Sequence, residues 1–261
     1  MRIVILTSNR VGTASYCLPD LVNSTNSEIV RVIYSRGIVK KDGAYYRKRL
    51  KKVWKIGILG AINGVRIRSW FKGSDKKENL RDIEAICKEL GVDYAETPAI
   101  NHATTVELIK TANADLGLSL GNSYIPKKVF SVPKFGMLNI HGEVLPDFQN
   151  AQSVIWQIYE NSPVTGYTIH KIDNKIDTGE IVKQEKFPIL FQSTLAETVR
   201  KTMDQILDKS CCGLIEVINN FEDYFNKART QGKGKSYTTP SYRQFRRIKR
   251  NFEILKNQYS I

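Results

Sequence analysis

Apolar runs and helical patterns alternate along the first 35 residues of the chain. The run at 3–6 is Ile-Val-Ile-Leu and ends at a polar turn, and the run at 28–34 follows a predicted helix that reaches Leu21. Short runs that are apolar throughout are typical of parallel strands covered on both faces. Strand, turn, helix and strand in this order open a doubly wound sheet, so we predict an α/β fold with a mostly parallel sheet.

The same alternation resumes near residue 79. A helix over 79–90 carries one apolar stripe and ends at Gly91, a residue that commonly terminates helices. Further strands are predicted at 93–95, 116–120, 137–140, 166–170 and 180–182, and further helices at 104–111 and 126–130. The strand at 137–140 would deliver His141 at its carboxyl end, which is where open α/β sheets bind ligands.

The last seventy residues are predicted to be mainly helical. The segment 194–221 has apolar residues at core spacing over its whole length, and a basic helix begins near Tyr242. We therefore expect one domain over 1–190 and a small helical appendage over 191–261. The apolar stripe of the long helix suits a core or a homodimer interface equally well.

Residues 37–75 interrupt the alternation and form a basic insertion. Residues 44–54 place aromatic and apolar side chains three to four positions apart, which predicts an amphipathic helix with lysines and arginines on its other face. We favour a solvated helix that packs its apolar stripe on the domain. A peripheral contact with a membrane surface, or with an acidic partner, is the alternative.

The net charge of +14 raises the question of a nucleic-acid partner. The charge is confined to two blocks, +12 over 36–77 and +9 over 227–256, so the rest of the chain is net acidic. We expect no nucleic-acid partner, while a non-catalytic α/β protein that binds nucleic acid or anionic membrane stays open as an alternative.

The chain shows no pattern of export or metal binding. The start, MRIVILTSN, lacks the long apolar region of a signal peptide, and the apolar stretch at 56–65 is far below the roughly 20 residues of a transmembrane helix. The four cysteines lack the spacing of metal ligands. We expect a cytoplasmic protein with no transmembrane segment and no metal site.

The candidate chemistry begins at the strand that precedes His141. Asn139 and His141 are two positions apart, so their side chains share one face of the strand, and the loop 172–179 supplies Asp177. An amide can stabilise an oxyanion, an imidazole can exchange a proton near neutral pH, and a carboxylate can orient the imidazole. These groups suit acyl transfer to an amine without an acyl-enzyme. A structural histidine or a phosphate-binding loop remains the alternative.

Three ordered segments, at 136–146, 165–170 and 176–181, resemble the 10-formyltetrahydrofolate-dependent formyltransferases. That family includes glycinamide ribonucleotide formyltransferase, methionyl-tRNA formyltransferase and the nucleotide-sugar N-formyltransferases. The resemblance implies a Rossmann-like catalytic domain, 10-formyltetrahydrofolate as the formyl donor, and Asn139, His141 and Asp177 as the catalytic residues. It also implies a folate site formed by Asn122, Ser123, Tyr124, Ile125, Asp173 and Ile176.

The chain departs from the family pattern where the amine acceptor is expected. The family usually has His-x-Ser before its Leu-Pro, whereas this chain has Gly142-Glu143, and the Arg-Gly of the tRNA enzyme is replaced within 147–151. We therefore expect Glu143, Gln149 and Asn150 to contact the acceptor. Arg10 follows the first strand, where it would meet a phosphate near a helix N-terminus.

The resemblance favours a nucleotide-linked amino sugar as the acceptor. Methionyl-tRNA formyltransferases carry a barrel-like domain after the catalytic domain, and the pattern after Pro188 is helical instead. Sugar N-formyltransferases of this kind serve the synthesis of surface polysaccharide such as the O-antigen of lipopolysaccharide. Another small amine or methionyl-tRNA is the alternative acceptor, and the nucleotide base, the sugar and the amine position stay open.

Overall fold

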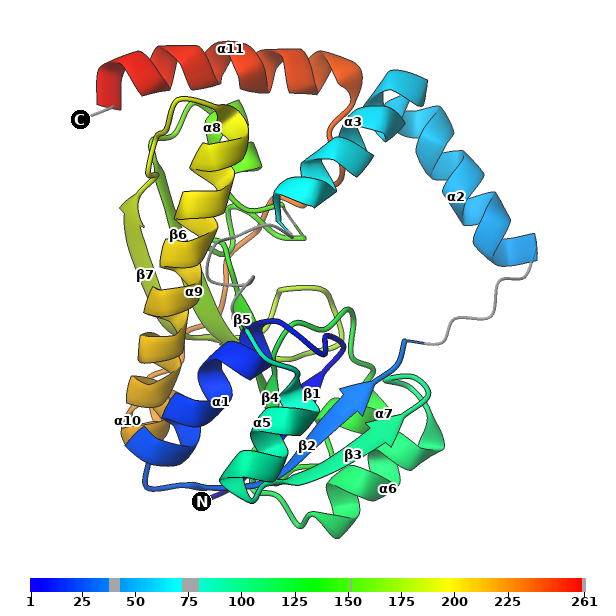
Figure 1. Cartoon of the computed structure of the whole chain (residues 1–261), viewed down its shortest axis with the longest axis vertical. Helices are drawn as coiled ribbons and strands as arrows, with labels where there is room; N and C mark the ends of the chain where they lie inside the picture. Colours follow the sequence, from blue (N-terminus) through cyan, green and yellow to red (C-terminus); the bar gives the residue numbers. More distant parts are fainter. Residues whose placement is uncertain (38–42, 72–79, 151, 260–261) are drawn as a thin grey trace.

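A seven-stranded sheet forms the centre of the computed structural model, which describes residues 1–37, 43–71, 80–150 and 152–259 (Figure 1). The strand order is β3-β2-β1-β4-β5-β6-β7. The strands are β1 (Arg2–Thr7), β2 (Glu28–Ser35), β3 (Asp93–Thr97), β4 (Leu116–Ser119), β5 (Met137–His141), β6 (Val164–Lys171) and β7 (Ile181–Pro188).

The first five strands pair in parallel, and β6 and β7 add antiparallel pairs at one side. This arrangement confirms the predicted α/β class with a doubly wound, mostly parallel sheet. From β1 the chain builds outward through β2 to β3 and then returns to add β4 on the other side of β1. Such a reversal of strand order opens a crevice at the carboxyl ends of the strands, where ligands bind in this class of fold.

Alternate residues of β1 belong to two separate cores, because successive side chains of a strand point to opposite faces. Ile3 and Ile5 lie in the larger core with α1 (Thr13–Ser24) and α5 (Ile83–Leu90). Val4 and Leu6 lie in the smaller core with residues of α6 (Ala103–Thr111) and α7 (Lys127–Phe130). The sheet is therefore covered on both faces, which explains the apolar runs in the sequence.

The C-terminal helices belong to the larger core. Val199 of α9 (Leu195–Asn219) and Ile248 of α11 (Tyr242–Tyr259) are fully buried in the same cluster as β1. The short α10 (Phe221–Asn226) follows α9. The helical nature of this region is confirmed. The predicted boundary near residue 190 stays a prediction, and the helices on its two sides share one core.

The sequence pattern did not predict α8 (Ile155–Tyr159), which packs under α11. The Asn251 side chain of α11 donates hydrogen bonds to the carbonyls of Ile158 and Tyr159, at 3.0 and 2.9 Å. Five residues are too few for a helical period to be recognised, so this element depends on its tertiary contacts.

The basic insertion contains two helices, α2 (Gly43–Ile56) and α3 (Ile58–Trp70), of which only the first was predicted. Glycines at 60 and 64 lower the intrinsic helix propensity of the second. Helix α2 packs mainly on α3 and projects away from the sheet (Figure 1). The predicted packing of its apolar stripe on the domain is wrong, because Tyr46, Leu50 and Trp54 are 53%, 60% and 88% exposed.

The described part of the chain contains no helix with both the length and the apolar character that a membrane span requires.

Candidate active site

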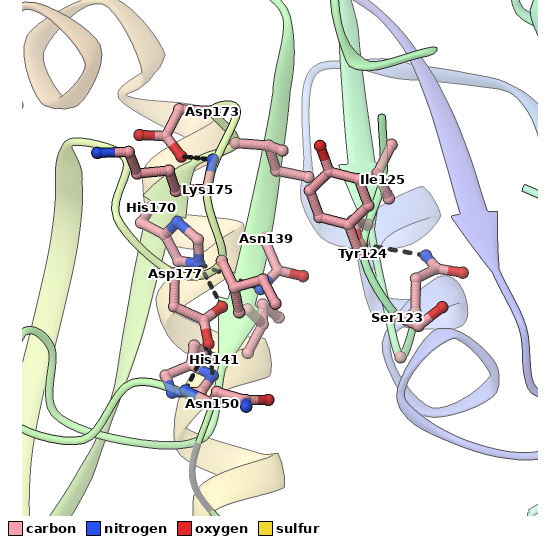
Figure 2. A pocket seen from close by; sticks show the side chains of 16 residues that line it. Ser123, Tyr124, Ile125, Asn139, His141, Asn150, His170, Asp173, Lys175 and Asp177 are labelled. Atoms are coloured by element: carbon pink, nitrogen blue, oxygen red, sulfur yellow. Dashed lines mark hydrogen bonds and ion pairs between the residues drawn. The ribbon is translucent and has the colours of Figure 1, made fainter. Parts of the chain in front are cut away.

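A cavity of about 490 Å³ lies at the carboxyl ends of β4 and β5, facing the loop between β6 and β7 (Figure 2). Its size is within the range typical of small-molecule sites. One wall is formed by the turn after β4, and the opposite wall by β5, the end of β6 and the following loop. The lining includes Ser119, Asn122, Ser123, Tyr124, Ile125, Asn139, His141, Asn150, His170, Asp173, Lys175, Ile176 and Asp177.

Strand pairing brings the polar side chains of β5 and β6 together. Asn139 and His141 point to the same face of β5, and the antiparallel register places His170 of β6 directly opposite Asn139. The ring centroids of the two histidines are 6.4 Å apart. Two histidines and an amide therefore meet at one end of the sheet (Figure 2).

The loop after β6 brings a carboxylate to both histidines. Asp177 lies in the left-handed region with φ +55°, an uncommon backbone conformation for a residue other than glycine. Asp173 holds the loop in place, because its carboxylate accepts hydrogen bonds from Thr178 Oγ1 at 2.7 and 2.9 Å and from the Lys175 amide at 3.0 Å. Glycine at position 179 allows the loop to approach the end of β6 closely, since a Cβ there would lie 1.8 Å from the Lys171 carbonyl oxygen.

The hydrogen bonds of His141 determine which of its ring nitrogens faces the cavity. Its Nε2 is 2.9 Å from the carbonyl oxygen of Phe148, and a carbonyl can only accept, so Nε2 carries a proton. The other nitrogen, Nδ1, is 3.7 Å from Asp177 Oδ2. The same carboxylate oxygen accepts the Asn150 backbone N–H at 2.9 Å. Nδ1 is therefore the atom that can gain or lose a proton beside a negative charge.

His170 is neutral in this arrangement and supports the other groups. Its Nδ1 donates to the Lys171 carbonyl at 2.9 Å, which leaves Nε2 to accept from Asn139 Nδ2 at 3.2 Å. Burial lowers the pKa of His170, and His141 lowers it further, while Asp177, 3.7 Å away, acts in the opposite direction. A neutral His170 can orient the Asn139 amide by accepting one of its two N–H groups. The other N–H of the Asn139 amide is then directed toward the cavity.

The opposite wall is fixed by the Asn122 side chain. Its Nδ2 donates to the Leu6 carbonyl and to Ser119 Oγ, and its Oδ1 accepts from Ser8 Oγ at 2.8 Å. Asn122 therefore ties the ends of β1 and β4 together. Tyr124 reaches across the cavity, where its hydroxyl is 3.4 Å from the Asn174 carbonyl oxygen.

Most of the residues predicted from the sequence line this one cavity. Asn139, His141 and Asp177 lie on one side, and Tyr124 and Ile125 face them (Figure 2). The remaining positions of the predicted folate site and Asn150 also line it: Asn122, Ser123, Asp173 and Ile176. The roles of these residues remain predictions, while their proximity is a property of the structure.

Glu143 does not line the cavity, so its predicted contact with the acceptor does not fit the structure. The side chain is fully buried, and Gln157 Nε2 donates a hydrogen bond to its Oε2. Alternation along β5 would place Glu143 on the face of Asn139 and His141, but the strand ends at His141 and the segment after it turns the carboxyl inward. Burial raises the pKa of Glu143 well above its ordinary value, and the nearby Asp177 raises it further.

Arg10 and Gln149 are also outside the lining of the cavity. Arg10 makes ion pairs with three carboxylates, those of Asp82, Glu84 and Glu96, and the hydrogen bonds to Asp82 and Glu84 raise its pKa. Its predicted phosphate contact therefore competes with carboxylates that already hold the guanidinium. Gln149 is 9% exposed and donates to the Asp177 carbonyl at 3.3 Å, so it supports the loop instead of facing the cavity.

His170 is a residue of the site that was not predicted from the sequence. It ends the segment 165–170, which carries part of the resemblance and contains the strand predicted at 166–170. The strand was predicted, but its antiparallel register against β5 was not, and that register brings His170 to Asn139.

Comparison with known proteins identifies one family. The sequence profile described as Formyl transferase matches residues 71–218, more than half of the chain. The methionyl-tRNA formyltransferase of Porphyromonas gingivalis is 28% identical over 141 residues, which cover 52% of this chain and 44% of that protein. The chain thus spans less than half the length of the curated relatives it matches.

Solved structures with the same fold include enzymes with different acceptors. Glycinamide ribonucleotide transformylase 1 from Symbiobacterium toebii has a TM-score of 0.56 at 17% identity, covering 89% of this chain and 94% of that one. The sugar 3N-formyl transferase WlaRD, solved in the presence of dTDP and 5-N-formyl-THF, has a TM-score of 0.54 at 17% identity, covering 91% of this chain and 69% of that one. At these identities the likeness concerns the fold alone.

Proposed function

The chain belongs to the formyl transferase family, and from that premise we propose that it transfers a formyl group from 10-formyltetrahydrofolate to the amine of a nucleoside-diphosphate-linked amino sugar. The observation that supports this most directly is the meeting of Asn139, His141 and Asp177 in one cavity. An enzyme of this type would act in the cytoplasm, in the synthesis of surface polysaccharide.

The cavity suits the donor in size and lining. A flat pterin ring would lie between the turn after β4 and the loop 172–177, where Tyr124 and Ile176 offer partly exposed apolar surface. Backbone groups of the same segments can bond the edge of the ring. Asp173 has its carboxylate engaged within the loop, so it would contribute mainly by keeping the loop in place.

The three polar groups fit direct transfer. The amine nitrogen attacks the formyl carbon, and its lone pair forms the new C–N bond while the carbonyl oxygen becomes an oxyanion. The free N–H of the Asn139 amide, together with a protonated His141 Nδ1, stabilises that oxyanion. The bond from the carbon to folate N10 then breaks, the proton from the amine passes to N10, and the products are the formamide and tetrahydrofolate.

Asp177 would stabilise the positive charge that the His141 imidazole carries in this step. Its Oδ2 lies 3.7 Å from His141 Nδ1 and is held by the Asn150 amide. An opposite charge at this distance stabilises an imidazolium. The carboxylate therefore acts on the reaction through the imidazole.

Two candidate acceptors have support among the relatives of the chain. A sugar 3N-formyl transferase solved in the presence of dTDP shares the fold over 91% of this chain. Methionyl-tRNA is a second candidate, because methionyl-tRNA formyltransferases are among the curated relatives that the chain matches.

The test offers both kinds of acceptor to the purified protein. We expect tetrahydrofolate to form from 10-formyltetrahydrofolate when a nucleotide-linked amino sugar is present, and not with the same sugar acetylated on its amine. His141→Ala should lower kcat by about a thousandfold, the scale of a lost general acid. His102→Ala, a histidine outside the cavity, is the matched control. Transfer to methionyl-tRNA alone would contradict the proposed acceptor, and an unchanged kcat in His141→Ala would contradict the mechanism.

A further inference from the structure

A second cavity, of about 560 Å³, lies between the insertion and the active site. Four cationic side chains line it, those of Lys51, Lys52 and Lys55 from α2 and Arg68 from α3. The rest of its lining is Ile56 of α2, residues from the catalytic half of the molecule and the segment that leads into α11: Asn150, Gln152, Thr238 and Thr239. No acidic residue of the described ranges lines this cavity.

The cations of this cavity have no ionic partner within the described part of the chain. Other basic side chains do: Arg10 pairs with three carboxylates, Lys235 with Glu160, and Lys209 with Glu185. Bringing four positive charges to one cavity without compensation costs free energy through mutual repulsion. A bound anion would remove that cost.

The cationic cavity adjoins the active site through Asn150, which lines both cavities. The backbone N–H of Asn150 donates to the Asp177 carboxylate at 2.9 Å. A molecule in the cationic cavity would therefore extend toward the carboxylate that lies beside His141.

Helix α3, which carries Arg68 and supports α2, packs closely on the segment before α11. A Cβ at Gly64 would lie 2.6 Å from Thr239 Cγ2, and one at Gly60 would lie 3.3 Å from the Ser241 Cα. The two glycines thus permit close packing of α3 on the segment before α11. Trp70 is 9% exposed, and its ring centroid is 6.2 Å from that of Phe245.

From these observations we infer that the cationic cavity binds the phosphate groups of the acceptor, with Lys51, Lys52, Lys55 and Arg68 as their counter-ions. Lysine and arginine are the common partners of phosphate, and arginine can bond two of its oxygens at once. The inference deepens the proposed function and rests on it for the identity of the acceptor as a phosphate ester.

The experiment measures binding and turnover in a charge-removal variant, Lys51→Ala/Lys52→Ala/Lys55→Ala. We expect its Kd for dTDP, UDP or GDP, whichever the unaltered protein binds, to rise by about tenfold or more, since each charge-assisted contact contributes to binding. Inorganic pyrophosphate should compete for the same site. With the amino-sugar substrate, KM should rise while kcat and folate binding stay unchanged. Lys249→Ala/Arg250→Ala removes like charges from the exposed face of α11 and is the control.

The outcomes separate this inference from the proposed function. The inference would be overturned if the triple variant bound the nucleotide as well as the unaltered protein does. It would also be overturned if the unaltered protein bound no nucleoside diphosphate, even where formyl transfer is observed. Loss of pyrophosphate binding in the variant, with no formyl transfer to any nucleotide-linked amino sugar, would leave the phosphate site standing and contradict the function.

Large apolar side chains are exposed on the outer surface of the same insertion. Seven large apolar side chains on α2 and α3 are at least half exposed, and they recur at helical spacing: Tyr46, Leu50, Trp54, Ile58, Leu59, Ile62 and Val65. Residues 43–70 contain eight lysines and arginines and no acidic residue. A second copy of this chain would bring like charges together, so charge complementarity favours an anionic surface.

We propose that this apolar surface of α2 and α3 docks on an anionic lipid bilayer, with its apolar side chains in the interface and the exposed Arg47, Arg49 and Arg66 at the headgroups. Co-sedimentation with phosphatidylcholine vesicles should be weak and should increase when phosphatidylglycerol is added. Leu50→Glu/Trp54→Glu should abolish it, while Ile254→Glu, on a partly exposed position of α11, should not. No binding to the anionic vesicles, or self-association that the double substitution abolishes, would contradict the proposal.

Discussion

The wall of the active-site cavity that β5, the end of β6 and the following loop form differs from the basic insertion in whether its polar side chains have partners. At the wall, Asn139, His141, His170 and Asp177 each contact another member of the set or a backbone group within 3.7 Å. In the insertion, the cations that face the second cavity have no ionic partner among the described residues, and large apolar side chains are exposed. A site for chemistry needs fixed geometry, whereas a site for binding keeps its groups available.

The two regions also differ in the contacts that hold them in place. The wall is built on paired strands and on a loop that Asp173 and Gly179 hold in place. The insertion is anchored through one face of α3, while α2 packs mainly on α3. Substitutions at the wall should therefore alter catalysis or folding strongly, and substitutions on α2 should alter mainly binding.

The largest effect is expected for Asp177→Asn. The amide cannot stabilise an imidazolium, and one orientation would place its NH₂ against the Asn150 N–H that the carboxylate now accepts. We expect kcat to fall by about 10² to 10⁴, the range for a proton-transfer group, with folate affinity retained. Steady-state kinetics together with equilibrium folate binding measure this, and a parallel loss of folate binding would point to collapse of the loop instead.

Gly179→Ala tests whether close packing holds the loop. The added methyl would meet the Lys171 carbonyl oxygen at 1.8 Å, so the loop must shift and move Asp177. We expect a loss of about 2 kcal/mol in the free energy of unfolding, in the range of overpacking, and a fall in kcat. Gly232→Ala, where nothing lies within 4 Å of the added atom, is the control for denaturation and kinetics. Equal effects at both glycines would contradict this account.

Glu143→Gln tests the buried carboxyl behind the wall. Because the folded state raises the pKa of Glu143, its neutral form contributes stability that is complete below the unfolded pKa of about 4.3 and is lost as the pH rises through the folded pKa. Glutamine resembles the neutral acid at every pH. We expect the variant to gain about 1 kcal/mol over the unaltered protein between pH 4 and pH 8, the scale of a buried polar group. Thermal melts at both pH values measure it, and a constant difference would argue against protonation.

The smallest effect on stability is expected for Trp54→Ala on α2. The side chain is 88% exposed, so its removal should change the free energy of unfolding by less than about 0.5 kcal/mol and leave kcat unchanged. Trp70→Ala on α3, where the ring is 9% exposed, should cost about 3 kcal/mol. Urea denaturation of both variants compares them directly, and a large effect at Trp54 would show that α2 packs on the body of the protein in solution.

Much of the site was predictable because its residues follow local rules. The apolar runs predicted the strands, and the spacing of Asn139 and His141 placed them on one face. The segment after β4 was recognised through its resemblance to a family. Glu143 was misplaced because the inward turn of the chain after β5 has no signature in the sequence.

Strand-length apolar runs and the residues that end them are enough to predict the α/β fold, the end of the sheet that holds the cavity, and the identity of the chemical groups there. The partners of those groups depend on how distant segments pack against one another. The register of β6 brought His170 to Asn139, and the packing of α3 on the segment before α11 set the cations of α2 beside Asn150. Contacts between distant segments depend on how elements pack, and no local pattern encodes that.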